Sequence, residues 1–263
     1  MRGVLIVLRR DMAELRRSTA LAIVIALFGI LTIGAVVGAS LLLRSVDLGT
    51  VQGMGARPGR PAGPGVAGEA MVPIVGFVVY FATMLPYITI VWAFGATLMI
   101  REKAAGNLET LLATPLGPLD IWLGKSLAIF LPAYALATGC ALAAVVAINV
   151  VVSIWQGAAV FVLPPAVWVT GLLVNPLFFF GLTSLTIILA FTHDPDVGIV
   201  PSFPIGFGLM AGVPLGVAVG VFDLAAWSFV LYGLGAAALL WAPILYLARS
   251  LTKERVVVSS RNG

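Results

Sequence analysis

Gly124-Lys125-Ser126 is the first pattern whose residue types could do chemistry, because glycine amides and a lysine hold the phosphates of ATP in phosphate-binding loops. Such a loop needs a further glycine five positions before Gly124, where this chain has Leu119. It also follows a strand, which the sequence does not predict here. We therefore interpret Lys125 as an anchor at the start of a membrane span, and we expect no catalytic residue and no ATP site in this chain.

His193, Asp194 and Asp196 form the second pattern, because imidazole and carboxylate groups can share a divalent metal ion. They stand in a short polar link between two apolar stretches, and the chain has no other histidine. We favour a turn over a metal site. Asp223 lies in another short connection, where a solvated turn is a simpler interpretation than a proton relay.

Uncharged polar side chains inside the apolar stretches are the third group. Interhelical hydrogen bonding is the simpler interpretation of these residues, and contact with a substrate is the alternative. No Asp, Glu, Lys, Arg or His stands near a predicted span centre, which argues against an ion-coupled carrier. The candidates for lining a pathway are Thr83, Thr89, Asn149, Asn175, Thr183 and Ser184.

Membrane-spanning helices must position these residues. The chain has 263 residues, of which 61% are hydrophobic and only 10% charged, whereas soluble domains are about 25% charged. A bilayer core is crossed by roughly 20 apolar residues in a helix. We predict an all-α integral membrane protein with six transmembrane helices, at 19–43, 71–100, 126–152, 166–191, 199–221 and 226–247.

The first residues predict a separate helix over 3–17 that lies in the membrane interface. Apolar and basic residues recur there on opposite faces at helical spacing. A plain charge cluster is the alternative, and the following apolar stretch is too long for a cleavable signal peptide. The expected apolar face consists of Val4, Leu5, Leu8, Met12 and Leu15.

The distribution of basic residues predicts the orientation. Twelve of the 15 Lys and Arg residues fall on the side of both termini, and three fall on the other side, in or beside the Gly- and Pro-rich loop 44–70. Because cytoplasmic loops carry the excess of basic residues, both termini are expected in the cytoplasm. These cations flank membrane spans, so we expect a lipid bilayer and no nucleic acid as partner.

The segment 101–125, REKAAGNLETLLATPLGPLDIWLGK, is the only substantial charged stretch between predicted spans. Within it, Asn107 can cap a short helix, Glu109 adds negative charge to the first turn, and Pro115 disfavours its continuation. A helix this short is not stable alone in water, so the spans or a partner must hold it. Its apolar face consists of Leu108, Leu111 and Leu112.

This segment resembles the cytoplasmic loop of the type-2 ATP-binding-cassette (ABC) transporter permeases, whose pattern is R-E-x-x-x-G-T-L-E-x-L-L-x-T-P followed by I-x-x-G-K. The chain differs at Asn107, where threonine is usual. The resemblance extends to the interfacial helix, the six spans and the short loop 193–196. It implies that 101–115 contains a coupling helix that docks on a separate ATPase. The residues concerned are Arg101, Glu102, Gly106, Asn107, Leu108, Glu109, Leu111, Leu112 and Pro115.

The same resemblance implies the transmembrane permease subunit of an ABC exporter in the cytoplasmic (inner) membrane. Two copies of an ATPase subunit would bind ATP and magnesium, and a second permease, identical or related, would complete the pathway. His193, Asp194 and Asp196 would make a second ATPase contact. A membrane scaffold or signalling subunit driven by a partner ATPase, or a secondary transporter, are the alternatives.

Overall fold

The computed structural model describes residues 2–45, 66–95, 114–156, 163–192 and 200–251, and within these ranges all regular structure is helical. The expected all-α class is therefore confirmed for this part of the chain. The helices are α1 (Arg2–Arg17), α2 (Thr19–Ser45), α4 (Val66–Phe94), α7 (Pro118–Gln156), α8 (Pro165–Val169), the π-helical turn η1 (Thr170–Val174), α9 (Asn175–Thr192), α11 (Ser202–Ala218) and α12 (Trp227–Arg249).

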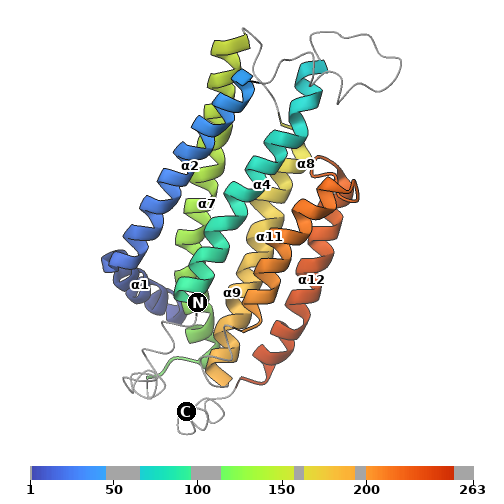
Figure 1. The fold of residues 1–263 in the computed structure, drawn as a ribbon. Helices are drawn as coiled ribbons and strands as arrows, with labels where there is room; N and C mark the ends of the chain where they lie inside the picture. Colours follow the sequence, from blue (N-terminus) through green and yellow to red (C-terminus); the bar gives the residue numbers. More distant parts are fainter. Residues whose placement is uncertain (1, 46–65, 96–113, 157–162, 193–199, 252–263) are drawn as a thin grey trace.

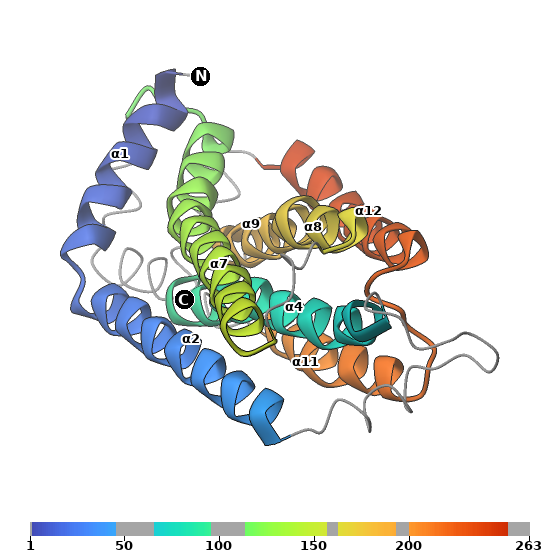
Figure 2. The ribbon, with the colours of Figure 1, turned by 90° about the horizontal axis from the view of Figure 1, so that it is seen from above.

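The helices form one bundle with α1 across its end. In Figure 1, α2, α4, α7, the α8–η1–α9 rod, α11 and α12 run along a common direction, and α1 turns away from it. The bend between α1 and α2 is 69°. The view from above in Figure 2 places α7 between α2 and α9, and α7 packs against α1, α2, α4 and α9. The helix that follows the segment 101–115 therefore contacts four other helices of the described chain.

Four of the described helices are long and apolar enough to cross a membrane. The pair α1 and α2 makes a fifth if it counts as one bent span. By contrast α11 has only 17 residues, which corresponds to about 25 Å, less than the roughly 30 Å of a bilayer core. The four are Val75–Phe94, Pro118–Val150, Pro165–Thr192 and Trp227–Arg249.

Exposed apolar side chains also fit a membrane protein. On α2, Ile23, Ile30 and Ile33 are each more than 60% exposed. Soluble monomers rarely expose contiguous apolar surface of this kind, whereas lipid accommodates it. The described chain is therefore consistent with a multi-pass membrane protein.

Two helices have bounds that differ from those of the spans predicted for them. Helix α4 begins at Val66, inside the predicted loop 44–70, and ends at Phe94 rather than at Ile100. Helix α7 begins at Pro118, well before the predicted start of the span at 126. Proline is favourable in the first turn because its missing N–H would have no helical partner there, and the acidic Asp120 complements the helix dipole.

Aromatic stacking fills the centre of the bundle. The ring of Tyr87 on α4 lies almost parallel to Phe179 on α9, with ring centroids 5.0 Å apart and 6° between the planes. The ring of Phe130 on α7 lies 5.8 Å from that of Tyr87, with 13° between the planes. Aromatic pairs add about 0.5–1.5 kcal/mol beyond their buried area, so this contact fixes α4, α7 and α9 to one another.

Candidate functional site

The face that α1 turns toward the bundle contains a carboxylate. Val7, Asp11 and Leu15, spaced four residues apart, are all buried. Leu5, which was expected on the apolar face, is instead 62% exposed. The buried face therefore includes Leu15, which the predicted apolar face contains, and also Val7 and Asp11, which it does not.

The partner of Asp11 is Lys125 on α7. Its Nζ atom donates a hydrogen bond to Asp11 Oδ2 over 3.2 Å, and the two side chains are only 2% and 3% exposed. Buried charges are tolerated when they are paired, because each replaces part of the hydration that the other lost. Lys125, which the sequence predicts as an anchor at the start of a membrane span, is buried in the described chain and joins α7 to α1.

Two glycines let α1 and α7 approach this closely. A Cβ atom at Gly124 would lie 2.7 Å from the Cβ of Val7. A Cβ atom at Gly3 would lie 2.8 Å from the Asp120 carboxylate. Both distances are too short for real side chains. A larger residue at Gly124 would push α1 away, whereas one at Gly3 would first displace the Asp120 carboxylate. Gly124 and Lys125 thus contribute to one contact, the first through its small size and the second through its charge.

The start of α7 is also attached to α9. The indole Nε1 of Trp122 donates to the backbone carbonyl of Ser184 over 3.0 Å, and both atoms are buried. Ser126 Oγ donates to the Trp122 carbonyl within α7. The first turns after the segment 101–115 are therefore linked to α1 on one side and to α9 on the other.

The end of α4, which precedes that segment, is attached to α11. Trp92 Nε1 donates to the Ser202 carbonyl over 3.3 Å. The Trp92 ring lies 4.9 Å from Phe203 and 5.2 Å from Phe207, measured between centroids. Gly206 leaves room for the indole, since a Cβ there would lie 2.7 Å from its Cζ2. Both helices that flank the segment thus contact further helices.

The polar residues predicted as pathway candidates divide into two groups. Asn175 Nδ2 donates to Thr83 Oγ1 over 2.9 Å, which joins α9 to α4. Thr83 in turn donates to the Tyr80 carbonyl. The others lie apart from this pair: Asn149 and Thr183 donate to carbonyls of their own helices, Thr89 is half-buried on α4, and the buried Ser184 hydroxyl has no hydrogen-bond partner.

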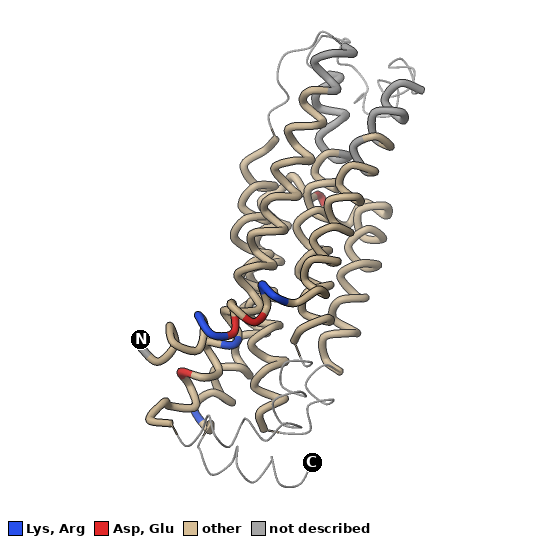
Figure 3. The backbone as a smooth tube through the Cα atoms, turned by 90° about the vertical axis from the view of Figure 1, so that its left-hand side faces the viewer, with Lys and Arg blue, Asp and Glu red and all other residues tan. Residues whose placement is uncertain are grey.

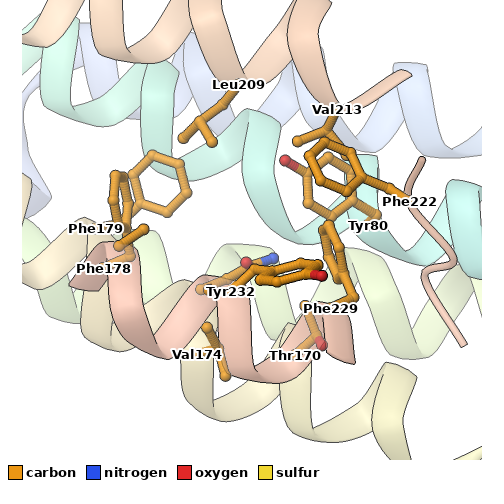
Figure 4. A pocket seen from close by; sticks show the side chains of 13 residues that line it. Tyr80, Thr170, Val174, Phe178, Phe179, Leu209, Val213, Phe222, Phe229 and Tyr232 are labelled. Atoms are coloured by element: carbon orange, nitrogen blue, oxygen red, sulfur yellow. The ribbon is translucent and has the colours of Figure 1, made fainter. Parts of the chain in front are cut away.

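A cavity of about 180 Å³ lies among α4, η1, α9, α11 and α12. Figure 4 shows aromatic rings around it, with Thr170 and Tyr232 on the same side as Phe229. Sequence reasoning missed this cavity because its wall comes from separate helices. The lining residues are Tyr80, Thr170, Val174, Asn175, Phe178, Phe179, Leu209, Val213, Phe222, Phe229, Tyr232, Gly233 and Ala236.

The π-helical turn on one side of the cavity has a local cause. Pro176 has no N–H group for the carbonyl four residues earlier, and its ring crowds that carbonyl. The neighbouring Asn175 N–H instead donates to the Thr170 carbonyl, five residues back. The widened turn changes the register of the helix there, and π-turns of this kind occur frequently at functional sites.

The opposite side of the cavity is closed by the end of α11. Gly220 has a φ of 76°, and its N–H donates to the Val217 carbonyl, while the Val221 N–H donates to Gly216. This pair of bonds is a Schellman motif, which favours glycine at the left-handed position. The chain then turns back and places Phe222 over Gly216, facing the cavity.

Charge in the described chain gathers at the α1 end of the bundle, as Figure 3 shows. Asp223 lies at the other end, where its Oδ1 accepts the Ala225 N–H in an exposed turn. The described residues contain no group of three or more potential metal ligands. The basic residues with described side chains are Arg9, Arg10, Arg16, Arg17, Lys125 and Arg249.

Most of the predicted coupling residues lie outside the described part of the chain. Pro115 is described, and it stands exposed in a bend before α7. The remaining predicted contacts with an ATPase fall in 96–113 and 193–199: Arg101, Glu102, Gly106, Asn107, Leu108, Glu109, Leu111, Leu112, His193, Asp194 and Asp196.

No known family model matches this chain, and comparison with curated proteins gives no match.

Proposed function

We propose that this chain is the transmembrane permease subunit of an ATP-driven ABC exporter, with both termini and the segment 101–115 on the cytoplasmic side of the inner membrane. The observation that carries the proposal is the packing of the two helices that this segment connects in the sequence. The sequence of the segment resembles a coupling helix, and the segment connects α4 to α7. The end of α4 is attached to α11, and the start of α7 is attached to α1 and α9.

In this proposal, four helices that are long and apolar enough to cross a membrane, together with α2 and α11, serve as the six spans that a permease of this type requires. They are α2, α4, α7, the α8–η1–α9 rod, α11 and α12, of which α11 is short. The helix α1 lies in the interface at the end where basic residues gather, which positive-inside logic assigns to the cytoplasm. A second permease, identical or related, completes the pathway, and two ATPase subunits supply ATP and magnesium binding.

Coupling follows from the attachments of α4 and α7. When ATP brings the two ATPases together, the movement of 101–115 displaces the adjoining ends of both helices. Trp92 passes this displacement to α11, while Trp122 and Lys125 pass it to α9 and α1. ATP and cargo shift the permease between two states only as far as each binds one state more tightly than the other.

The test is a pair of substitutions in the coupling segment, Glu109→Lys and Leu112→Asp. Burial of a leucine side chain is worth about 1.5–3 kcal/mol, which corresponds to roughly a 10- to 100-fold loss of affinity for the ATPase. Each variant is purified with the partner ATPase, and the fraction of ATPase that stays bound and the rate of ATP hydrolysis are measured. Arg60→Ala, in the predicted external loop, is the control and should match the wild type.

Wild-type retention and hydrolysis in both variants would contradict the proposal. If the wild-type chain retains the ATPase but no substrate enters vesicles in an ATP-dependent way, the chain is a scaffold or signalling subunit. Flux that persists without the ATPase would indicate a secondary transporter.

A further inference from the structure

We propose that α1 binds the headgroup of an anionic phospholipid, with the phosphate held over Ala13 by the arginines that surround this residue. The proposal does not rest on the exporter function, because it requires only that the bundle crosses a membrane. The arginines are Arg9, Arg10, Arg16 and Arg17.

The four arginines surround one small residue on the outer face of α1. Arg9 and Arg10 stand four and three positions before Ala13, and Arg16 and Arg17 stand three and four positions after it. Residues at these spacings are neighbours on a helix surface, with Cβ atoms about 5–6 Å apart. All five side chains are exposed. Because alanine has only a methyl group, a phosphate can lie over it and accept hydrogen bonds from guanidinium groups of both adjoining turns.

The positive charge of this face is not balanced within α1. Of the two acidic residues of the helix, Asp11 is turned inward and bonded to Lys125. Glu14 is exposed, and helical spacing places it beside Arg10 and Arg17. The other two arginines have no acidic residue of α1 three or four positions away. The outer face therefore has an excess of cations, which attracts the anionic lipids of a membrane surface.

The direction of α1 places this face at the membrane surface. Helix α1 meets α2 at 69°, so it lies nearly across the direction of the bundle, as Figure 1 shows. Leu5 and Ile6, one turn before Arg9 and Arg10, are 62% and 61% exposed. In an interfacial helix such apolar side chains enter the edge of the acyl layer, while arginines reach the phosphates. An acidic protein surface would match the charges but not the two apolar side chains, whereas a phospholipid matches both.

The opposite face of α1 is fixed to the bundle. Val7, Asp11 and Leu15 are buried there, and Asp11 is bonded to Lys125 of α7. The helix and its row of arginines are therefore in place before a lipid arrives, and binding has only side chains to order.

The experiment counts the lipids that stay bound to the purified full chain in detergent, by native mass spectrometry. Dioleoylphosphatidylglycerol is anionic, and dioleoylphosphatidylcholine has the same acyl chains but no net charge. We expect saturable binding of phosphatidylglycerol that is tighter than that of phosphatidylcholine and that weakens as the salt concentration rises. Glycerol phosphate, which has the phosphate without acyl chains, should not displace phosphatidylglycerol at equal concentration.

Three substitutions that each lower the net charge by one locate the binding. Arg9→Gln should weaken phosphatidylglycerol about fivefold, which is the contribution expected of one basic residue near anionic lipid. Ala13→Glu places a carboxylate among the arginines, where it competes with the phosphate, and should weaken binding at least as much. Arg249→Gln, at an exposed position at the end of α12, is the control and should change the affinity little. Binding of phosphatidylcholine should be the same in all three variants.

Positions 9 and 13 are exposed, so both α1 variants should fold, which thermal unfolding checks. Equal affinity of the wild type for the two lipids would overturn the proposal, as would equal losses in Arg9→Gln and Arg249→Gln. Displacement by glycerol phosphate would overturn it in favour of a site for free anions. If Ala13→Glu binds phosphatidylglycerol as the wild type does but no longer retains a partner ATPase, the arginines contact an acidic protein surface instead.

Discussion

Lys125 Nζ and Asp11 Oδ2 lie 3.2 Å apart in the interior and join the second turn of α7 to the middle of α1. The pair holds an otherwise peripheral helix against the centre of the bundle. A buried ion pair contributes little net stability compared with two apolar residues, because both charges lose hydration. Removal of only one of the two charged side chains is costly, because the other charge then stays buried without this counter-charge.

The first prediction follows from this difference between removing one charge and replacing both. Lys125→Ala and Asp11→Ala should each lower the free energy of unfolding by about 3–5 kcal/mol, whereas the double variant Asp11→Leu/Lys125→Met should recover most of the loss. Thermal unfolding in detergent measures the three changes. Glu14→Ala, at an exposed position of α1, is the control and should change little. A single Lys125→Ala variant as stable as the wild type would show that the pair does not form.

The second prediction concerns the attachment of α7 to α9. Trp122→Phe removes the indole donor and leaves the buried Ser184 carbonyl without it, which should cost about 1–3 kcal/mol of stability. Trp227→Phe makes the same chemical change at a residue that is 59% exposed, and its effect should be within about 0.5 kcal/mol. Equal losses in the two variants, measured by unfolding, would argue against the bond.

The third prediction concerns the turn that closes the cavity. Gly220→Ala should destabilise the protein by roughly 1–2 kcal/mol, because residues with a Cβ atom disfavour left-handed backbone conformations. Gly139 is exposed and lies within α7, with open space around the position of a Cβ atom. Gly139→Ala should therefore stabilise the chain slightly, by about 0.5–1 kcal/mol. If both variants unfold at the same temperature, the turn at Gly220 does not constrain the chain.

The fourth prediction concerns orientation. Single cysteines at positions 59 and 107, in a Cys140→Ala background, should react differently with an impermeant reagent added to intact cells. Position 59 should be labelled and position 107 should not, because the basic residues place 101–125 in the cytoplasm. Membranes opened with detergent give the control, in which both positions react. Labelling of 107 alone in intact cells would reverse the assigned topology.

The spans predicted from hydropathy have nearly the same bounds as helices of the structure where the helix contains no charged residue in its interior. The predicted span 226–247 corresponds to Trp227–Arg249, and 166–191 to Pro165–Thr192. Helix α7 begins at Pro118, before the predicted span 126–152, and Lys125 lies within it. A charge can stand inside a helix when its counter-charge is near, but Asp11 is 114 residues away in the chain. Hydropathy along the sequence contains no signal for that pairing.

The candidate site was less predictable than the helices. Thr83 and Asn175 could both be named from the sequence, but their bond depends on how α4 and α9 are rotated toward each other. The cavity depends on the π-helical turn before Pro176 and on the tight turn at Gly220, which together set the positions of rings from several helices. Proline and glycine can suggest local irregularity, but not which side chains an irregular backbone brings together.

The sequence separation between Asp11 and Lys125 imposes an order on biosynthesis. The carboxylate leaves the ribosome 114 residues before its cation, a delay of roughly 6–23 s at about 5–20 residues per second. During that time α1 has no counter-charge to hold it in the interior, so it occupies its final place only after α2, α4 and the start of α7 have been made. A ribosome-bound chain that stops before residue 118 should leave α1 open to protease, whereas a chain that continues past α7 should protect it.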